Sequence, residues 1–183
     1  MTATGGRAEE KLVYRPSFDA LIAGMSDRAT PAFRDELAKL GVVIDRMLPG
    51  YPYDTFEKTA LAAARLFTEL EPADAMAEVG KRLCLSTIDT NPVGKTLLPL
   101  LKLMGTARAL KRVYSKSTGE NYNVVSFGAE TGKSLVMHMS DVGNIPDMAR
   151  GSIIGMGDAM GVKLRAKITA FDAPKVSYLI EWD

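Results

Sequence analysis

The sequence predicts an α+β fold: a helical N-terminal part packed on a C-terminal antiparallel sheet of about four strands, with one Gly-rich helix between the strand pairs. Two observations predict this class. Up to about residue 120, apolar residues recur every three or four positions, the period of a helix with one buried face. From Asn121 onward they recur at every second position, as in strands, and a glycine-containing segment at 145–161 interrupts that pattern once.

The first helical segments carry recognisable start and stop residues. In "TPAFRDELAKLG" we expect Thr30 to be the N-cap, Pro31 to occupy the first helical position and Gly41 to end the helix. Residues 11–25 predict a short extended entry followed by a helix that is capped by Ser17.

The next helix is predicted over 53–71, where Asp54 and Glu57 have the spacing of a capping box. Its apolar residues lie three and four positions apart, so they share one face of the helix. They are Phe56, Ala60, Ala63, Phe67 and Leu70. Pro72 begins a further amphipathic helix.

The segment "NPVGKTLLPLLKLMG" predicts another helix that begins at Asn91 and Pro92. Leucine lies on nearly every side of it, so we expect this helix to be buried. Its internal Pro99 is expected either to kink it or to divide it from the next segment.

Four strands are predicted, at 121–127, 133–140, 162–171 and 176–182, with "GAETG" as the turn between the first two. In the second strand, His138 shares one face with Val136 and Ser140. Leu135, Met137 and Met139 share the other face.

The segment between the strand pairs predicts a helix opened by Pro146 and closed by Gly161. Gly151, Gly155 and Ala159 lie four positions apart and form a smooth stripe. Each internal glycine costs about 0.5–1 kcal/mol relative to alanine, so close approach should compensate for it. We favour tight packing on the sheet or another helix, and the alternative is space for a ligand between helix and sheet.

Length and composition are those of an ordinary globular protein: 183 residues, 46% hydrophobic and 25% charged. We expect a disordered tail at 1–10 and a single α+β domain at 11–183. One cysteine, Cys84, excludes an internal disulfide, and the N-terminus lacks the apolar core of a signal peptide. The apolar runs are shorter than the roughly 20 residues of a membrane span. These features predict a cytoplasmic protein without a membrane span.

Motifs for catalysis and for metals fail on inspection. "GKT" at 94–96 follows Asp89 where a phosphate-binding loop needs glycine, and "GMGDAMG" has the wrong spacing for a dinucleotide fingerprint. One histidine and one cysteine do not supply the ligands of a typical zinc site. We therefore expect no enzymatic activity, no catalytic residue and no metal.

Charge is asymmetric although the net charge is only +1. Residues 90–119 contain no acidic side chain. We predict an anion- or partner-binding edge in this segment, formed by Arg108, Lys111, Arg112 and Lys116. Such a run is usually a solvated face or pairs with an acidic segment, here 69–78. It could also bind nucleic acid, a phosphorylated ligand or a membrane surface. Nucleic acid is disfavoured, because no motif that reads bases is present.

The segments "YPYDTFEKTALAAARLF", "GKTLLPLLKLMGTARALKRV" and "GENYNVVSF" resemble a paralogous domain-of-unknown-function family found largely in myxobacteria. More distantly, "LVMHMSDVGNIPDMARGSIIGMGDAMGVKL" is similar to part of the haem-based nitric oxide/oxygen sensor domains and of the 4-vinyl reductase-like domains. The resemblance implies the same order of helices and strands that the periodicity predicts.

The haem sensors carry a Tyr-x-Ser-x-Arg motif that binds the haem propionates. Its matching positions here are His138, Ser140 and Val142, so only the serine is retained. The resemblance also places their iron-binding histidine on a helix before the sheet, where this chain has none. Since a haem iron needs an axial ligand, we expect no haem and no other cofactor.

The resulting hypothesis is a non-enzymatic sensory or regulatory domain that binds a small apolar ligand between the helices and the sheet. The resemblance to 4-vinyl reductase-like domains implies a lipid or a tetrapyrrole-like molecule. We expect the ligand to contact His138, Ser140, Met148, Gly151 and Gly155, and the change to pass to a protein partner. The alternative is an interaction module that acts through the basic edge or by homodimerisation.

Overall fold

The computed structural model describes residues 11–116, 124–140 and 142–183. The tail expected at 1–10 lies outside these ranges. The helices are α1 (Arg15–Gly24), α2 (Pro31–Lys39), the 3-10 turn η1 (Ile44–Arg46), α3 (Tyr53–Ala64), α4 (Pro72–Thr90), α5 (Pro92–Met104), α6 (Thr106–Lys116) and α7 (Pro146–Met160). The strands are β1 (Leu12–Tyr14), β2 (Gly50–Pro52), β3 (Val125–Thr131), β4 (Ser134–Met139), β5 (Leu164–Asp172) and β6 (Lys175–Trp182). The chain has the α+β architecture that its sequence predicts.

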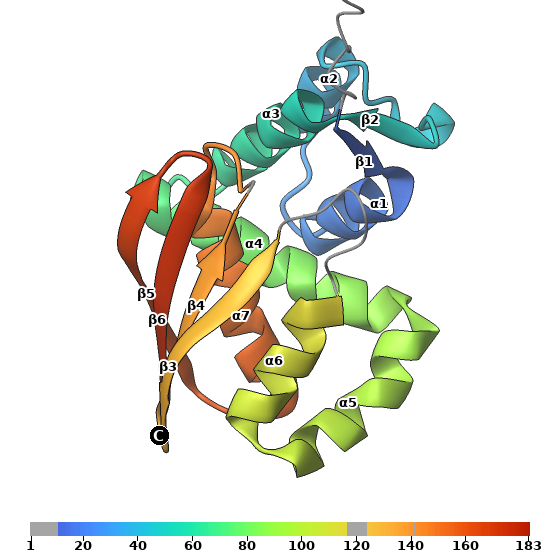
Figure 1. Ribbon diagram of the computed structural model, residues 1–183. Helices are drawn as coiled ribbons and strands as arrows, with labels where there is room; N and C mark the ends of the chain where they lie inside the picture. Colours follow the sequence, from blue (N-terminus) through green and yellow to red (C-terminus); the bar gives the residue numbers. More distant parts are fainter. Residues whose placement is uncertain (1–10, 117–123, 141) are drawn as a thin grey trace, which may run out of the picture.

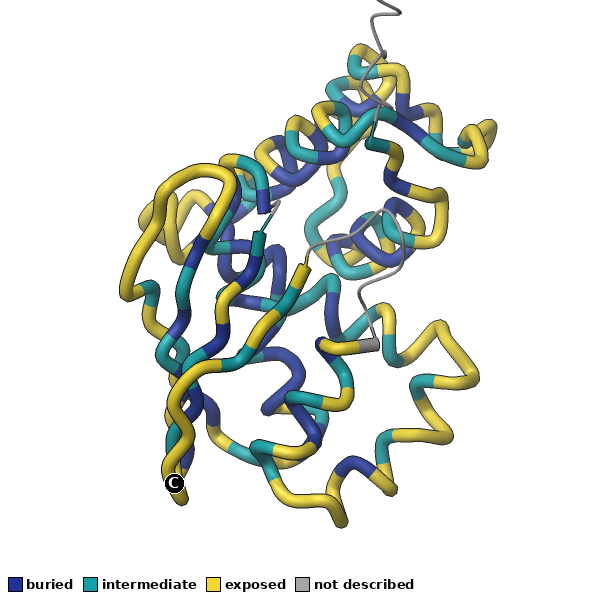
Figure 2. The backbone as a smooth tube through the Cα atoms, in the orientation of Figure 1, coloured by how far each residue is buried: buried dark blue, intermediate teal, exposed yellow. Residues whose placement is uncertain are grey.

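Helices α4 and α7 form the centre of the molecule (Figure 1). The antiparallel sheet β3-β4-β6-β5 lies on one side of them. The β1-β2 pair and helices α1 to α3 lie at one end of the molecule, and α5 and α6 lie at the other. Buried backbone is concentrated along α4, α7 and the sides of the elements that face them (Figure 2).

Only one face of the four-stranded sheet is covered by helices. Leu135, Met137 and Met139 of β4 are buried on that inner face, and the neighbouring Tyr178 of β6 is fully buried. The Tyr178 hydroxyl donates a hydrogen bond of 2.7 Å to the carbonyl of Pro146, which fixes the start of α7 against the sheet. The period-two prediction is therefore confirmed. The turn is at 132–133, so only the last residue of "GAETG", Gly132, belongs to it, because β3 continues through Thr131.

Helices α4 and α7 approach so closely that only glycine fits at two points. A Cβ atom on Gly80 would lie 1.8 Å from the carbonyl oxygen of Met148, and one on Gly151 would lie 1.7 Å from that of Ala77. Gly155 also faces α4, and a Cβ atom added to it would lie 2.8 Å from the carbonyl oxygen of Lys81. The stripe of small residues on α7 therefore packs against another helix, as the favoured interpretation had it.

Thr30 caps α2 as predicted, since its Oγ1 accepts a hydrogen bond of 3.2 Å from the backbone N–H of Phe33. We expect Thr30→Ala to lower the free energy of unfolding by about 1 kcal/mol, because one N–H at the helix start loses its acceptor. Thr30→Ser, which keeps the hydroxyl, should retain most of the stability. Urea unfolding of the three proteins measures both effects, and equal midpoints for alanine and threonine would contradict this role.

Two other predicted helix starts are wrong. Helix α1 begins at Arg15, so Ser17 lies inside the helix rather than capping it. Helix α3 begins at Tyr53, directly after Pro52, and no side chain caps it, so Asp54 is not an N-cap. The same helix ends at Ala64, before the predicted end, because the chain turns there and brings Phe67 into the core from the following turn.

The expectations for the leucine-rich segment are only partly met. Helix α5 begins at Pro92, and Asn91 caps it by accepting a hydrogen bond from Val93, as predicted. It continues through Pro99, and the division from α6 falls at Gly105, whose φ of 81° ends the helix. The expected burial is wrong: Leu101 is its one buried residue, because α5 lies at the edge of the molecule and packs through one side only.

Candidate functional site

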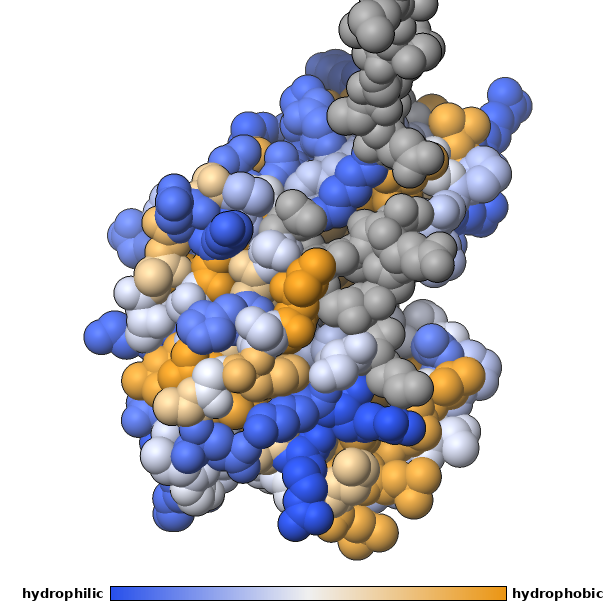
Figure 3. Space-filling model, viewed as in Figure 1, coloured by the Kyte–Doolittle hydropathy of each residue, from blue (hydrophilic) through white to orange (hydrophobic). Residues whose placement is uncertain are grey.

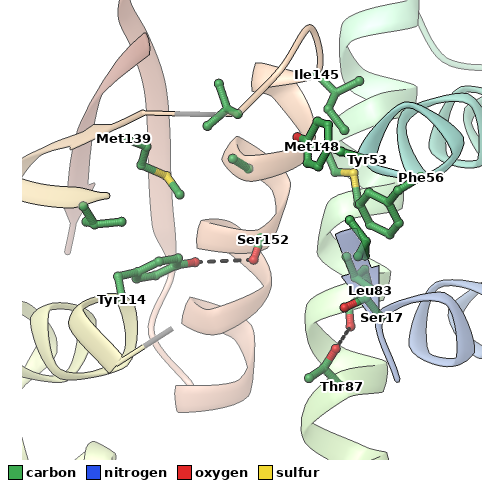
Figure 4. A pocket seen from close by; sticks show the side chains of 14 residues that line it. Ser17, Tyr53, Phe56, Leu83, Thr87, Tyr114, Met139, Ile145, Met148 and Ser152 are labelled. Atoms are coloured by element: carbon green, nitrogen blue, oxygen red, sulfur yellow. Dashed lines mark hydrogen bonds between the residues drawn. The ribbon is translucent and has the colours of Figure 1, made fainter. Parts of the chain in front are cut away.

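A cavity of about 330 Å³ lies where the N-terminal elements, helices α4 and α7, and the inner face of the sheet meet (Figure 4). It separates two hydrophobic clusters, one in the N-terminal part and one between α7 and the sheet. Its lining from the N-terminal half consists of Val13, Ser17, Tyr53, Phe56, Leu83 and Thr87. Its lining from the C-terminal half consists of Tyr114, Val125, Met139, Val142, Ile145, Met148, Ala149 and Ser152.

Helical spacing places several of these side chains. Leu83 and Thr87 are four residues apart on α4, and Met148 and Ser152 are four residues apart on α7, so each pair shares one face of its helix. Met139 enters from the inner face of β4. The cavity therefore depends on the fixed distance between α4 and α7 that their close packing sets.

The lining residues that the structure describes carry no charge. Their polar side-chain atoms are mainly hydroxyl groups. Tyr114 Oη lies 3.4 Å from Ser152 Oγ, and Thr87 Oγ1 donates to the Leu83 carbonyl at 2.8 Å, so these three hydroxyl groups already have partners. Burial raises the pKa of the Tyr114 hydroxyl, so this group stays neutral. Ligand pockets range from about 300 to 1,000 Å³, so this cavity suits a small, neutral and mainly apolar molecule.

Of the five residues predicted to contact a ligand, the structure places Met148 in the lining. His138 lies on the outer face of the sheet, exposed to solvent, with Nδ1 2.7 Å from Ser177 Oγ on the neighbouring strand. Ser140 Oγ donates to the Val124 carbonyl at 3.3 Å and is not part of the lining. Gly151 and Gly155 face α4. The structure therefore does not bring His138 together with Met148, because the strand face that carries His138 points away from the helices.

The sequence contained usable signals for two of the missed residues: Phe56 lies on the apolar face predicted for its helix, and Met139 gives the second signal. Met139 belongs to the apolar face of its strand, and that face was the one to expect towards the interior. The other missed residues, such as Tyr114, Ser152 and Val142, come from three separate segments. Their convergence is set by the packing of the elements, which no local pattern encodes.

The predicted basic edge lies on α6, but its cations differ in their exposure and in their ion-pair partners. Arg108 and Arg112, four residues apart, are exposed on one face of the helix. The Lys111 ammonium forms an ion pair with Glu130 of β3 instead of facing solvent freely. Lys116 ends the helix, and its side chain lies outside the described part of the chain. The expected pairing with 69–78 is absent among the described cations of this helix.

A family model matches residues 11–183. The chain belongs to the DUF2378 family. Its description is "Protein of unknown function", so membership assigns no activity. A comparison with curated proteins found no match.

Solved structures similar to this DUF2378 chain include several H-NOX proteins. The Fe(II) unliganded H-NOX protein from K. algicida is 12% identical, with 93% of this chain and 97% of that chain covered and a TM-score of 0.64. The H-NOX protein from S. oneidensis in the Fe(II)NO state is 14% identical, with 93% and 99% covered and a TM-score of 0.66. An oxygen-binding H-NOX domain related to soluble guanylate cyclases is 13% identical, with 91% of this chain and 93% of that chain covered and a TM-score of 0.65. At these identities the likeness shows the fold alone.

Metal clusters and membrane spans are both absent from the described part of this DUF2378 chain. Within 11–116, 124–140 and 142–183, the side chains of His, Cys, Asp and Glu form no cluster that could hold a metal ion. In the same ranges every helix is too short or too polar to cross a bilayer.

Cys84 is buried on α4 close to the cavity wall, and burial raises the pKa of its thiol to about 11. Below about pH 8.5 the thiol is neutral in the folded and unfolded chains alike. Between about pH 8.5 and pH 11 the thiol is ionised in the unfolded chain but still protonated in the folded chain. The free energy of unfolding therefore falls as the pH rises through this range.

We therefore expect iodoacetamide to label Cys84 slowly at pH 8 in the folded protein and rapidly in urea. Mass spectrometry of the labelled chain measures both rates. Equal rates with and without urea would contradict the burial of the thiol.

Proposed function

We propose that this chain is a non-enzymatic sensory domain that binds a small, neutral and mainly apolar molecule in the cavity between its helices and its sheet. The observation that supports this proposal is that the described residues of the lining, which come from both halves of the chain, are all uncharged. The H-NOX-like fold supports a sensory role, because the similar structures are described in the Fe(II)NO state, as an oxygen complex or as Fe(II) unliganded.

Haem does not fit the residues around this cavity, and we propose a different ligand. Haem iron is commonly held by histidine, and the only histidine of the chain, His138, lies on the outer face of the sheet. Cys84 is outside the lining and carries a neutral thiol, which is a poor ligand compared with a thiolate. The described lining also lacks any cation that would pair with the two carboxylates of haem.

The position of the cavity suits transmission of a signal. Met148 belongs to the N-terminal cluster, whereas Met139 and Tyr114 belong to the cluster under the sheet, so one ligand would contact both. A ligand that favours one relative position of these clusters shifts the population of conformations. We propose that a partner protein detects this shift.

Titration of the purified full chain with N-phenylnaphthylamine, a neutral apolar dye, tests the proposal. We expect saturable binding with one site and a fluorescence increase, and no Soret band shift when haemin is added in a parallel titration. Absence of saturable dye binding would contradict the apolar site. A sharp Soret band with one haem per chain would contradict the rejection of haem.

A further inference from the structure

Helix α5 has a second apolar face, and this face is turned to solvent. Val93, Leu97, Leu100 and Met104 follow the spacing four, three and four, so they lie in one line along the helix. All four are exposed, and Leu103 beside them is 84% exposed. The inward side is separate: Leu101 is buried, and Leu98 packs against the cluster under the sheet. The outward stripe therefore serves no packing purpose within the described chain.

Cations border this apolar stripe. Helix α6 follows directly after Gly105 and presents Arg108 and Arg112 to solvent. Figure 3 shows the hydrophobic surface over α5 next to a strongly hydrophilic surface over α6. Since residues 90–119 contain no acidic side chain, the charge that α5 and α6 themselves contribute there is wholly positive.

We propose that the surface formed by α5 and α6 docks on an anionic lipid bilayer. An exposed row of leucines beside arginines is the composition of helices that lie in the membrane interface, with the apolar side chains among the acyl chains and the cations at the headgroups. Anionic lipids attract each such cation, and the attraction falls off within a Debye length. Docking of this kind requires no spanning helix.

The shape of the surface favours a bilayer over a groove in a protein. Helix α5 lies at the edge of the molecule (Figures 1 and 2). Its apolar stripe is exposed to solvent, and the strongly exposed Leu103 comes two residues before Gly105, at the end of the helix. A bilayer accepts a protruding apolar helix without a matching cavity. Its anionic headgroups can also pair with Arg108 and Arg112, which form no ion pair with the described residues. The ligand cavity is formed by other residues of the chain, so docking and ligand binding can be measured separately.

Sedimentation with lipid vesicles tests this inference on the full chain. Vesicles made of equal amounts of phosphatidylcholine and phosphatidylserine should sediment the protein, vesicles of phosphatidylcholine alone should not, and added salt should release it. We expect Leu100→Ser with Leu103→Ser to weaken binding about tenfold or more. Arg108→Glu with Arg112→Glu should weaken it at least as much.

Matched variants elsewhere on the surface serve as controls. Leu48→Ser with Leu61→Ser removes leucines that are 56% and 45% exposed, compared with 56% for Leu100. Lys163→Glu with Lys167→Glu reverses two exposed cations next to and on β5. Both controls should bind as the unmodified chain does, and urea unfolding confirms that all variants fold.

Three results would overturn the inference. The first is no sedimentation with the anionic vesicles, and the second is an equal loss in the control variants. The third is a dimer, seen in light scattering, that Leu100→Ser with Leu103→Ser converts to a monomer while vesicle binding is unchanged. In that case a second copy of the chain, and not a bilayer, covers the apolar stripe.

Discussion

Gly151→Ala should lower the free energy of unfolding by about 3 kcal/mol or more, since it overpacks a close contact between backbones. The added Cβ would lie 1.7 Å from the carbonyl oxygen of Ala77, a backbone atom that has no rotamer by which to move away. The two helices would have to separate, and the packing between the two hydrophobic clusters would loosen with them. Gly80→Ala, which meets the Met148 carbonyl from the other helix, should have a similar effect.

Gly132→Ala is the matched control for these substitutions. It makes the same chemical change in the turn between β3 and β4, where an added Cβ meets nothing within 4 Å. Urea unfolding of the three variants should show a large loss for the two helix positions and a loss below about 0.5 kcal/mol for the turn. Equal stability of Gly151→Ala and Gly132→Ala would contradict the close approach of α4 and α7.

Ala149→Phe should strongly weaken binding of an apolar ligand while the chain still folds. Ala149 is half-buried in the cavity wall, and a benzyl group at this position fills much of the 330 Å³. The remaining space falls below the roughly 300 Å³ at which ligand pockets begin, so we expect the affinity for N-phenylnaphthylamine to drop at least about tenfold.

Ala170→Phe provides the comparison, because Ala170 is exposed on β5 and outside the cavity. The affinity of this variant for the dye should match that of the unmodified chain. If Ala149→Phe binds the dye as tightly as Ala170→Phe does, the dye site is elsewhere on the protein and the proposed cavity is not the ligand site.

The sequence predicts the elements of this fold well where the signal is local. Thr30 and Pro31 mark the start of α2 because capping depends on three neighbouring residues. The strands and α7 follow from periodicity, since each has one face against the core. Ser17 and Asp54 fail for the opposite reason: the structure starts those helices immediately after β1 and β2, so strand pairing sets the boundary.

The candidate site could not be predicted in the same way. Leucine content predicts burial of α5, but whether a neighbour covers the outward stripe depends on the position of the whole helix. His138 is the only histidine in the sequence, but it lies at an outward-facing position of its strand, on the face opposite Met137 and Met139. The cavity residues come from elements distant in the sequence, although Phe56 and Met139 lay on faces whose apolar pattern indicated the interior.

Native mass spectrometry of freshly purified protein, with an absorbance spectrum of the same sample, tests the central claim most directly. We expect a small additional mass on the folded chain that is lost on denaturation, that is absent from Ala149→Phe and that brings no Soret band. A mass equal to haem with a Soret band would contradict the proposed ligand class. A bare chain that also fails to bind N-phenylnaphthylamine would contradict the proposal that the cavity is a ligand site.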